Sequence, residues 1–160
     1  MNPAVLIPAA AAIGIGLGLV LALVSYLTTG LSPGGMMTPG WLAVTLVSDA
    51  RLFAVIAAVT FVTYGLGSIA QAYVILYGKR LFAATVLIGV LLQAALTLLL
   101  SRELPLLYTN QTLGFVVPGL ISYQLTRQPT GPTLLATGVT TLLTYVLLLA
   151  GVLLGFVPHL

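Results

Sequence analysis

The side chains that could do chemistry in this chain of 160 residues are few, and most of them are cations. There are five Lys and Arg residues, two acidic residues, one histidine and no cysteine. The histidine is His159, and the two acids, Asp49 and Glu103, lie far apart in the sequence. A metal site needs several convergent ligands, a paired-acid mechanism needs two adjacent carboxylates, and an activated nucleophile needs a nearby base. The sequence therefore predicts no catalytic residue and no metal site.

The cations predict a partner of opposite charge. They give the chain a formal net charge of +3, and they are Arg51, Lys79, Arg80, Arg102 and Arg127. So few basic residues, spread along the chain, do not make a nucleic-acid footprint. Anionic lipid or an anionic substrate fits better. Asp49 beside Arg51, and Glu103 beside Arg102, are most simply ion pairs at a membrane surface.

Two basic sites remain as candidates for binding a polymer or a partner protein. Lys79 and Arg80 follow Tyr77 and Gly78, a sequence typical of a tight turn anchored among lipid headgroups, and anchoring alone would explain them. The alternative is that the two cations dock an anionic chain or an acidic protein surface. Arg127 and Gln128 form the second site, and Arg51 is a further candidate.

The composition predicts that the elements carrying these residues lie in a membrane. Hydrophobic residues make up 60% of the chain and charged residues 4%, against roughly a quarter charged in soluble domains. Runs free of charge cover residues 4–28, 52–78, 81–101 and 128–160, and each exceeds the about 20 residues that cross the hydrocarbon. No Lys or Arg lies near the first residue, which argues against a cleaved signal peptide. We expect an all-α, multi-pass membrane domain over 1–160, with helices near 4–28, 51–77, 81–101 and 133–157.

Two apolar segments between these helices contain helix breakers. Pro33, Gly35, Pro39 and Gly40 interrupt the first segment, and Pro118-Gly119 interrupts the second. The apolar stretches that follow, residues 41–48 and 120–126, are too short to span. We expect short re-entrant helices there, each with its proline in the first turn, and Thr38 as a cap for the first. Irregular backbone at membrane depth survives only inside protein or beside a wet cavity.

The chain looks duplicated. The two Pro-Gly pairs are 79 residues apart, and the words TFVTY at 60–64 and TLLTY at 141–145 are 81 apart. Such spacing predicts an internal two-fold repeat with halves near 1–78 and 79–160. If the short helices do not cross the membrane, the repeat is parallel, and if a breaker segment crosses, the halves are inverted. The placement of the cations leaves the orientation open.

Pairs of glycines in the outer helices predict close helix packing. Gly14 and Gly18, like Gly151 and Gly155, are spaced i to i+4. Small residues let helix backbones approach closely in a membrane. The glycines could be merely tolerated in lipid, or they could serve self-association into a homo-oligomer or contact with a partner helix.

The chain resembles the PgsC/CapC family, whose members are membrane proteins of the bacterial poly-γ-glutamate (capsule) biosynthesis complex. The resemblance covers most of the chain and lies in SPGGMMTPGWLA at 32–43, ILYGKRLFAA at 75–84 and GFVVPGLISYQLTRQ at 114–128. The matching positions are Pro33, Gly35, Pro39, Gly40, Tyr77, Gly78, Lys79, Arg80, Pro118, Gly119, Leu120, Ile121, Arg127 and Gln128. Members commonly carry charged residues after the first helix, where this chain has SYLTTG, and that departure speaks against a charge-based role there.

This resemblance implies a subunit of the bacterial cytoplasmic (inner) membrane that works with an ATP-dependent amide ligase and an outward-facing accessory subunit. The complex would make poly-γ-glutamate and export or anchor it. ATP and Mg would then bind the ligase, and the chain itself has no Gly-rich phosphate loop ending in Lys-Ser/Thr. We expect no enzymatic activity from the chain alone and no cofactor of its own. A small stand-alone transporter and a non-catalytic scaffold for the ligase are the alternatives.

Overall fold

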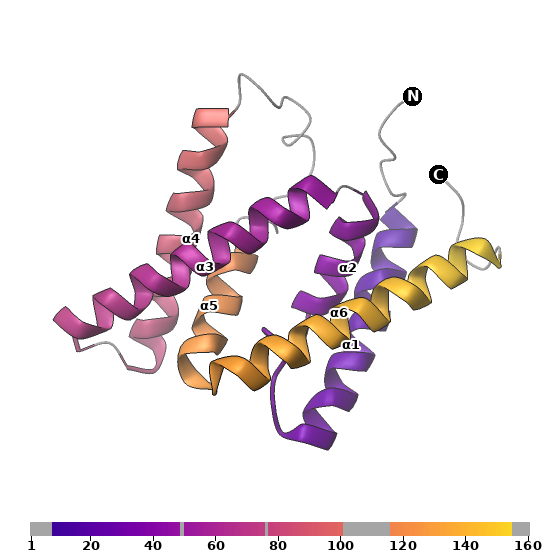
Figure 1. The fold of residues 1–160 in the computed structure, drawn as a ribbon, viewed down its shortest axis with the longest axis horizontal. Coiled ribbons are helices and arrows are strands. Elements are labelled where there is room, and N and C mark those ends of the chain that lie inside the picture. Colours follow the sequence, from indigo (N-terminus) through magenta and orange to yellow (C-terminus); the bar gives the residue numbers. More distant parts are fainter. Residues whose placement is uncertain (1–7, 49, 76, 101–115, 155–160) are drawn as a thin grey trace. The chain divides into compact units, whose positions relative to one another are not determined.

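The computed structural model describes residues 8–48, 50–75, 77–100 and 116–154. Within these ranges all regular structure is helical, which confirms the all-α prediction. The helices shown in Figure 1 are α1 (Pro8–Thr29), α2 (Thr38–Ser48), α3 (Ala50–Tyr73), α4 (Lys79–Leu100), α5 (Val117–Arg127) and α6 (Thr130–Leu153).

Four of these helices are long and apolar enough to cross a membrane, as the sequence predicts. The candidate spans are Ala11–Thr29, Phe53–Tyr73, Lys79–Leu96 and Thr130–Leu153. Their ends differ from the expected ones by a few residues. α6 begins at Thr130 rather than near residue 133, because a proline such as Pro132 is tolerated in the first turn, where its missing amide breaks no helical hydrogen bond.

The two short helices begin in the same way. Each has 11 residues, which corresponds to about 16 Å of helix and is half of what a membrane span needs. Each starts one residue before its proline, and the first helical hydrogen bond spans that proline. The amide of Trp41 donates to Met37 O at 3.2 Å, and the amide of Leu120 donates to Val116 O at 3.1 Å. The predicted place of both prolines is confirmed.

Helix lengths agree between the two halves of the sequence. α1 and α4 have 22 residues each, α2 and α5 have 11, and α3 and α6 have 24. In the first half, residues 30–37 connect the long helix α1 to the short helix α2.

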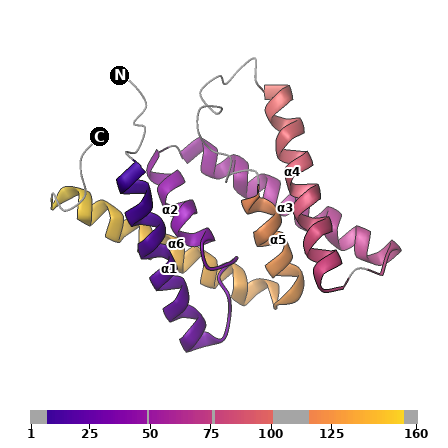
Figure 2. The ribbon, with the colours of Figure 1, turned by 180° about the vertical axis from the view of Figure 1, so that it is seen from behind.

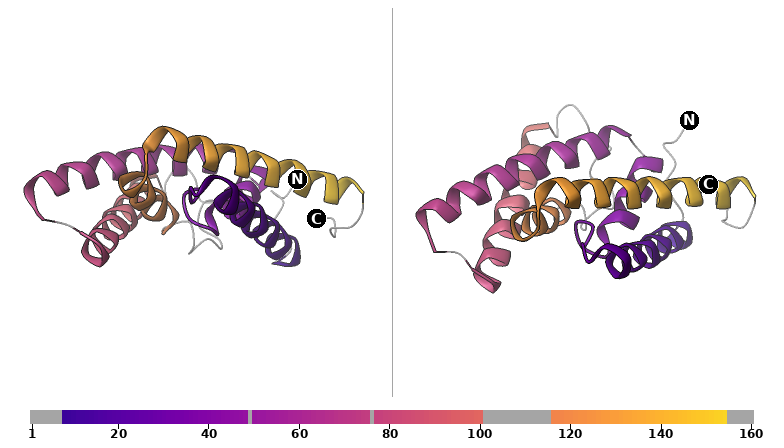
Figure 3. Two further views of the ribbon diagram at one scale, coloured as in Figure 1. Left: turned by 90° about the horizontal axis from the view of Figure 1, so that it is seen from below. Right: turned by 60° about the horizontal axis from the view of Figure 1, so that its bottom comes forward.

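The chain forms two compact units, and these are not the sequence halves. Unit 1 consists of the residues up to Phe53 and those from Gln128 onward, so it combines α1 and α2 with α6. Unit 2 is residues 54–127 and combines α4 and α5 with α3 beyond Phe53. In unit 1, α6 packs along both α1 and α2 (Figure 3). In unit 2, α5 packs beside α4 (Figure 2).

The buried faces of α3 and α6, the last long helix of each sequence half, are rich in threonine. On α6 these are Thr133, Thr137, Thr140, Thr141 and Thr144, and on α3 they are Thr60 and Thr63. All but one of these hydroxyls donate to the carbonyl four residues earlier, at 2.7 to 2.8 Å in most cases and 2.6 Å for Thr140. Such internal hydrogen bonds satisfy a polar side chain where water is absent. Thr141 Oγ1 is the exception, since it is buried and has no hydrogen-bond partner among the described residues.

Candidate functional site

The first candidate site is the contact between Pro39-Gly40 and Gly18, which we call the first junction. A methyl group placed on Gly18 would overlap the Cα and the amide nitrogen of Gly40. One placed on Gly40 would lie 2.8 Å from Ile15 Cα and 2.9 Å from Ile15 O. Backbone therefore lies directly on backbone, which only glycine permits.

The second junction, between Pro118-Gly119 and Gly89, repeats this arrangement in unit 2. A methyl group on Gly89 would lie 2.9 Å from Gly119 N and 3.0 Å from Gly119 Cα. One on Gly119 would lie 2.6 Å from Val86 Cα. Pro118 and Gly119, like Pro39 and Gly40, are buried. The two Pro-Gly pairs therefore serve as close-contact points between a short helix and the long helix that precedes it in the sequence.

Both junctions lie at the middle of the long helix. Gly18 is central in Pro8–Thr29, and Gly89 is central in Lys79–Leu100. From each junction the short helix runs back toward the first turn of the long helix. In unit 1, Val44 of α2 lies against Gly14, and in unit 2, Tyr123 of α5 lies against Phe82. The prediction that these helices are re-entrant stays a prediction.

The glycines predicted for packing include Gly14 and Gly18, and both face α2. A methyl group on Gly14 would overlap side-chain atoms of Val44 and Leu148. The neighbours of this glycine pair are thus helices α2 and α6 of the same chain. Gly151 is half-buried on α6, and Gly155 lies outside the described residues.

The segment that leads into α2 is fixed by polar contacts within unit 1. Pro33 is buried, and Gly35 has a φ of 105°, a left-handed value that favours glycine. Gln128 Oε1 accepts a hydrogen bond from Ser32 N at 3.2 Å and one from Thr133 Oγ1 at 3.3 Å. The amide oxygen of Gln128, a predicted polymer-binding residue, is thus engaged in holding this segment to the start of α6.

Thr38, the expected cap of α2, makes a different bond. Its hydroxyl donates to Gly34 O at 2.8 Å and is buried. The side chain therefore ties the first turn of α2 to the glycine turn before it.

Three predicted cations gather at one end of unit 2, which we call the basic end: Lys79, Arg80 and Arg127. Arg127 Nη1 donates to Tyr123 OH at 3.1 Å, and its guanidinium carbon lies 5.5 Å from the Tyr123 ring centroid. The Tyr123 ring meets Phe82 edge to face, with centroids 5.2 Å apart. Phe82 belongs to the first turn of α4, which starts with Lys79 and Arg80. Packing against α4 thus brings Arg127 to the end of unit 2 that carries the other two cations.

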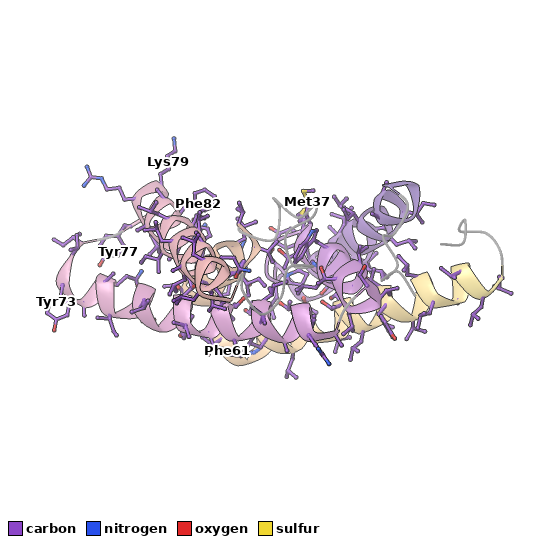
Figure 4. The ribbon with its side chains drawn as sticks, turned by 90° about the horizontal axis from the view of Figure 1, so that it is seen from above. Met37, Phe61, Tyr73, Tyr77, Lys79 and Phe82 are labelled. Atoms are coloured by element: carbon purple, nitrogen blue, oxygen red, sulfur yellow. The ribbon has the colours of Figure 1, made fainter. Side chains whose placement is uncertain are left out.

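The described residues of the turn between α3 and α4, at the basic end, are exposed. Tyr77 is 78% exposed and Tyr73 is 86% exposed, and Figure 4 shows both with Lys79 around this turn. Gly78, predicted to allow a tight reversal, has a φ of 57°, a left-handed value that glycine adopts without strain. This φ suits the tight reversal predicted at Gly78, and the anchoring of Tyr77 among lipid headgroups stays a prediction.

Arg51 belongs to the other compact unit. It is the second residue of α3 and is exposed, whereas the Lys79 turn follows the opposite end of that 24-residue helix. The structure therefore brings three of the four predicted cations together, and Arg51 is not among them. Within the described ranges there is no group of three metal-ligating side chains.

Sequence reasoning missed one polar contact at the second junction. Ser122 is buried, and its Oγ donates to Thr60 O at 3.0 Å, so it joins α5 to α3. The sequence did contain a signal for the buried face that Ser122 meets. Threonines recur in α3 and α6 at spacings of three or four residues, and that spacing places them on one face of a helix.

Comparisons with known proteins agree with the resemblance in the sequence. The profile of the family described as Capsule biosynthesis CapC matches residues 17–134. The chain is 33% identical over 132 residues to the "Capsule biosynthesis protein CapC" of Bacillus anthracis, which covers 75% of this chain and 83% of that protein. It is 31% identical over 128 residues to the "PGA biosynthesis protein CapC" of Bacillus subtilis (strain 168), with the same coverage of both chains. No solved structure matches significantly. On this evidence, the chain belongs to the CapC family of capsule biosynthesis proteins.

Proposed function

We propose that this chain is the membrane subunit of a poly-γ-glutamate synthesis and export complex. It supports an ATP-dependent amide ligase and handles the polyanionic product in the cytoplasmic membrane. Family membership supports the role in capsule biosynthesis. The observation that carries the handling role is the pair of junctions, which hold a proline-broken backbone against the middle of two apolar helices.

The ligase supplies the chemistry in this proposal. ATP and Mg bind to it, an outward-facing accessory subunit receives the product, and the present chain has no activity alone. Its contribution is a passage or anchor whose backbone is interrupted at mid-membrane. Transporters use such broken helices because the half-helix ends expose backbone groups that bind charged ligands.

We further infer that each short helix is the second half of a membrane crossing. α2 starts beside the midpoint of α1 and runs back toward its first turn, so α2 ends on the side where α1 begins. α5 has the same relation to α4. Each half then crosses three times, as a long helix, a broken segment and a second long helix. Because three is an odd number, the two halves form an inverted repeat, the alternative to the re-entrant, parallel arrangement.

The absence of cysteine makes this path directly testable. Thr29→Cys and Tyr77→Cys variants can each be labelled with a membrane-impermeant maleimide in intact cells and in inverted vesicles. A broken crossing puts both positions on the same side of the membrane, whereas re-entrant helices put them on opposite sides. Labelling from opposite sides would contradict the inverted repeat and leave the role in capsule synthesis standing.

A stand-alone transporter is the second candidate function, because the central junctions suit a solute pathway as well as a polymer pathway. The deciding experiment expresses the ligase and accessory subunit with and without this chain in a host that makes no capsule. We expect cell-surface poly-γ-glutamate only when this chain is present. Equal polymer without it would refute the proposed function, and uptake of glutamate by the purified chain in liposomes would favour the transporter.

The scaffold alternative makes a different prediction in the same host. A scaffold needs only to hold the ligase, so Pro118→Ala and Pro39→Ala variants that insert normally should support full polymer output. A polymer handler needs the breaks, because alanine allows the helix to extend past the interruption. We expect output to fall while the ligase still copurifies with the chain.

A further inference from the structure

The net charge of the chain is concentrated in one place. Of the seven charged residues, Arg51 has Asp49 two positions away and Arg102 is followed by Glu103, so these four sum to zero. The formal charge of +3 therefore equals the contribution of Lys79, Arg80 and Arg127. These are the three cations of the basic end.

The local structure leaves this charge without an acidic neighbour among the described residues of unit 2. α4 has no acidic residue in its first turn, although the amino end of a helix favours negative charge. Lys79 and Arg80 occupy that end, so the positive ends of the peptide dipoles add to two side-chain charges. Arg127 adds a third charge, which its stacking on Tyr123 holds in place. All three residues are exposed.

We propose that the basic end faces the cytoplasm and docks the polycarboxylate chain as it leaves the ligase. This inference rests on the proposed function and adds to it the side of entry and the residues that meet the polymer. Positive residues in short loops next to membrane spans stay on the cytoplasmic side, and the basic end gathers three of the five Lys and Arg residues of the chain. The ligase, which depends on ATP, delivers its product from the same side.

The position of α5 favours a polymer over a lipid headgroup as the occupant. The helix leads directly from Arg127 at the basic end to Pro118-Gly119 at the middle of α4. A carboxylate chain bound at Arg127 therefore meets the helix whose other end is the broken backbone at mid-membrane. A headgroup requires no such connection. Poly-γ-glutamate carries one charge per residue, so one chain can engage all three cations at once.

The side of entry is tested by labelling the Tyr77→Cys variant, whose cysteine is the only one in the chain. An impermeant maleimide should label it in inverted vesicles and not in intact cells. Labelling from outside the cell would overturn the inference. That result would leave the proposed function unchanged, because the dependence of polymer synthesis on this chain tests the function separately.

Polymer docking is tested with the purified full chain in nanodiscs of neutral phosphatidylcholine and fluorescent poly-γ-glutamate. The triple variant Lys79→Gln, Arg80→Gln, Arg127→Gln should bind at least about 10-fold more weakly, and wild-type binding should fall steeply with salt. The matched control, Lys79→Arg, Arg80→Lys, Arg127→Lys, keeps the charge and should bind like the wild type. Equal binding by the neutral triple variant would overturn the proposal.

A lipid occupant would give a distinct result. Wild-type nanodiscs of neutral lipid would then bind no polymer, while anionic phosphatidylglycerol would bind to the wild type and not to the neutral triple variant. That outcome assigns the basic end to the lipid surface and overturns polymer docking. Polymer binding that survives added phosphatidylglycerol supports the proposal.

Discussion

The two junctions have the same close backbone contact but differ in the polar bond beside it. In unit 2, Ser122 lies three residues after Gly119 and donates to Thr60 O. In unit 1, the residue three positions after Gly40 is Ala43, which has no hydroxyl to donate. Thr141 begins the sequence TLLTY, which matches TFVTY at Thr60, and among the described residues its buried hydroxyl has no hydrogen-bond partner. The comparison suggests that glycine, shared by both junctions, sets the helix contact, and that the hydroxyl bond is an addition.

The two units also differ in which of the two packed helices carries the small residue at their contact. In unit 1, α1 supplies Gly14 and α6 supplies Leu148 at their contact. In unit 2, α4 supplies Thr85 and α3 supplies Gly67, where a methyl group would lie 3.2 Å from Thr85 Cγ2. The small residue sits on opposite partners in the two units. Close helix packing requires one small residue per contact, and either helix can provide it.

The largest effect should come from adding a methyl group to the central glycines. Gly18→Ala should destabilise the chain by about 3 kcal/mol, because the new methyl overlaps backbone atoms of Gly40 that cannot move aside. Gly89→Ala should cost less, because its methyl meets Gly119 at 2.9 to 3.0 Å. The midpoint of denaturation in a detergent series measures both. Gly16→Ala is the control, since no described residue beyond its own helical turn comes within 4 Å of that methyl. The reverse order of the two central variants would mean that the junctions are not equivalent contacts.

A smaller effect is expected where Gln128 holds the segment before α2 to the start of α6. Gln128→Ala removes the acceptor for Ser32 N and Thr133 Oγ1 and should cost about 1 to 2 kcal/mol. The same denaturation series measures it. Protease cleavage near residues 30–37 should rise in parallel, because the segment before α2 loses its attachment. Gln128→Glu keeps an acceptor and is the matched control. A stability loss without added cleavage would mean that Gln128 does not stabilise the chain by holding residues 30–37 in place.

Ser122→Ala isolates the polar bond that only unit 2 has. We expect a loss of about 0.6 kcal/mol, a typical value for one such bond between membrane helices. Thr126→Ala on the same helix is a suitable comparison, because that hydroxyl donates to Ser122 O within α5 and joins no second helix. A loss at Ser122 as large as that for Gly18→Ala would show that the hydroxyl, rather than glycine, sets the contact.

The smallest effect tests whether unit 1 can accept the bond that it lacks. Ala43→Ser places a hydroxyl at the position equivalent to Ser122, on a residue that is fully buried. If the α6 backbone near Thr141 is placed as Thr60 is in unit 2, stability should rise by a few tenths of a kcal/mol. Ala43→Cys, similar in size but a weak donor, should bring no gain. A loss for the serine variant would mean that the units differ in backbone placement as well as in side chains.

The sequence predicted the elements of this fold better than their partners. Hydropathy located the four long helices, because a lipid environment requires continuous apolar runs, and the rule for proline in a first turn located α2 and α5. Nothing in the local sequence indicated that α3 packs with α4 and α5 while α6 packs with α1 and α2, because both faces of such helices are apolar and partner choice depends on shape.

Site prediction had a similar limit. Charge selected Lys79, Arg80, Arg127 and Arg51 as candidate binding residues. The grouping of Arg127 with Lys79 and Arg80 depends on the direction in which α5 packs against α4, and neither spacing nor composition encodes that direction. The role of Gln128 as an acceptor for Ser32, 96 positions away, was invisible for the same reason.

The pairing of α6 with α1 and α2, and of α3 with α4 and α5, has a consequence for biosynthesis. Unit 2 is one continuous stretch of chain, so every part of it has been translated once residue 127 leaves the ribosome. Unit 1 contains α1 and α2, which are translated before unit 2, and also α6, which is translated after it. During translation, α1 and α2 therefore wait with the threonine-rich partner surface missing, and anything that shields Gly14 and Val44 over that interval acts as a chaperone for this protein.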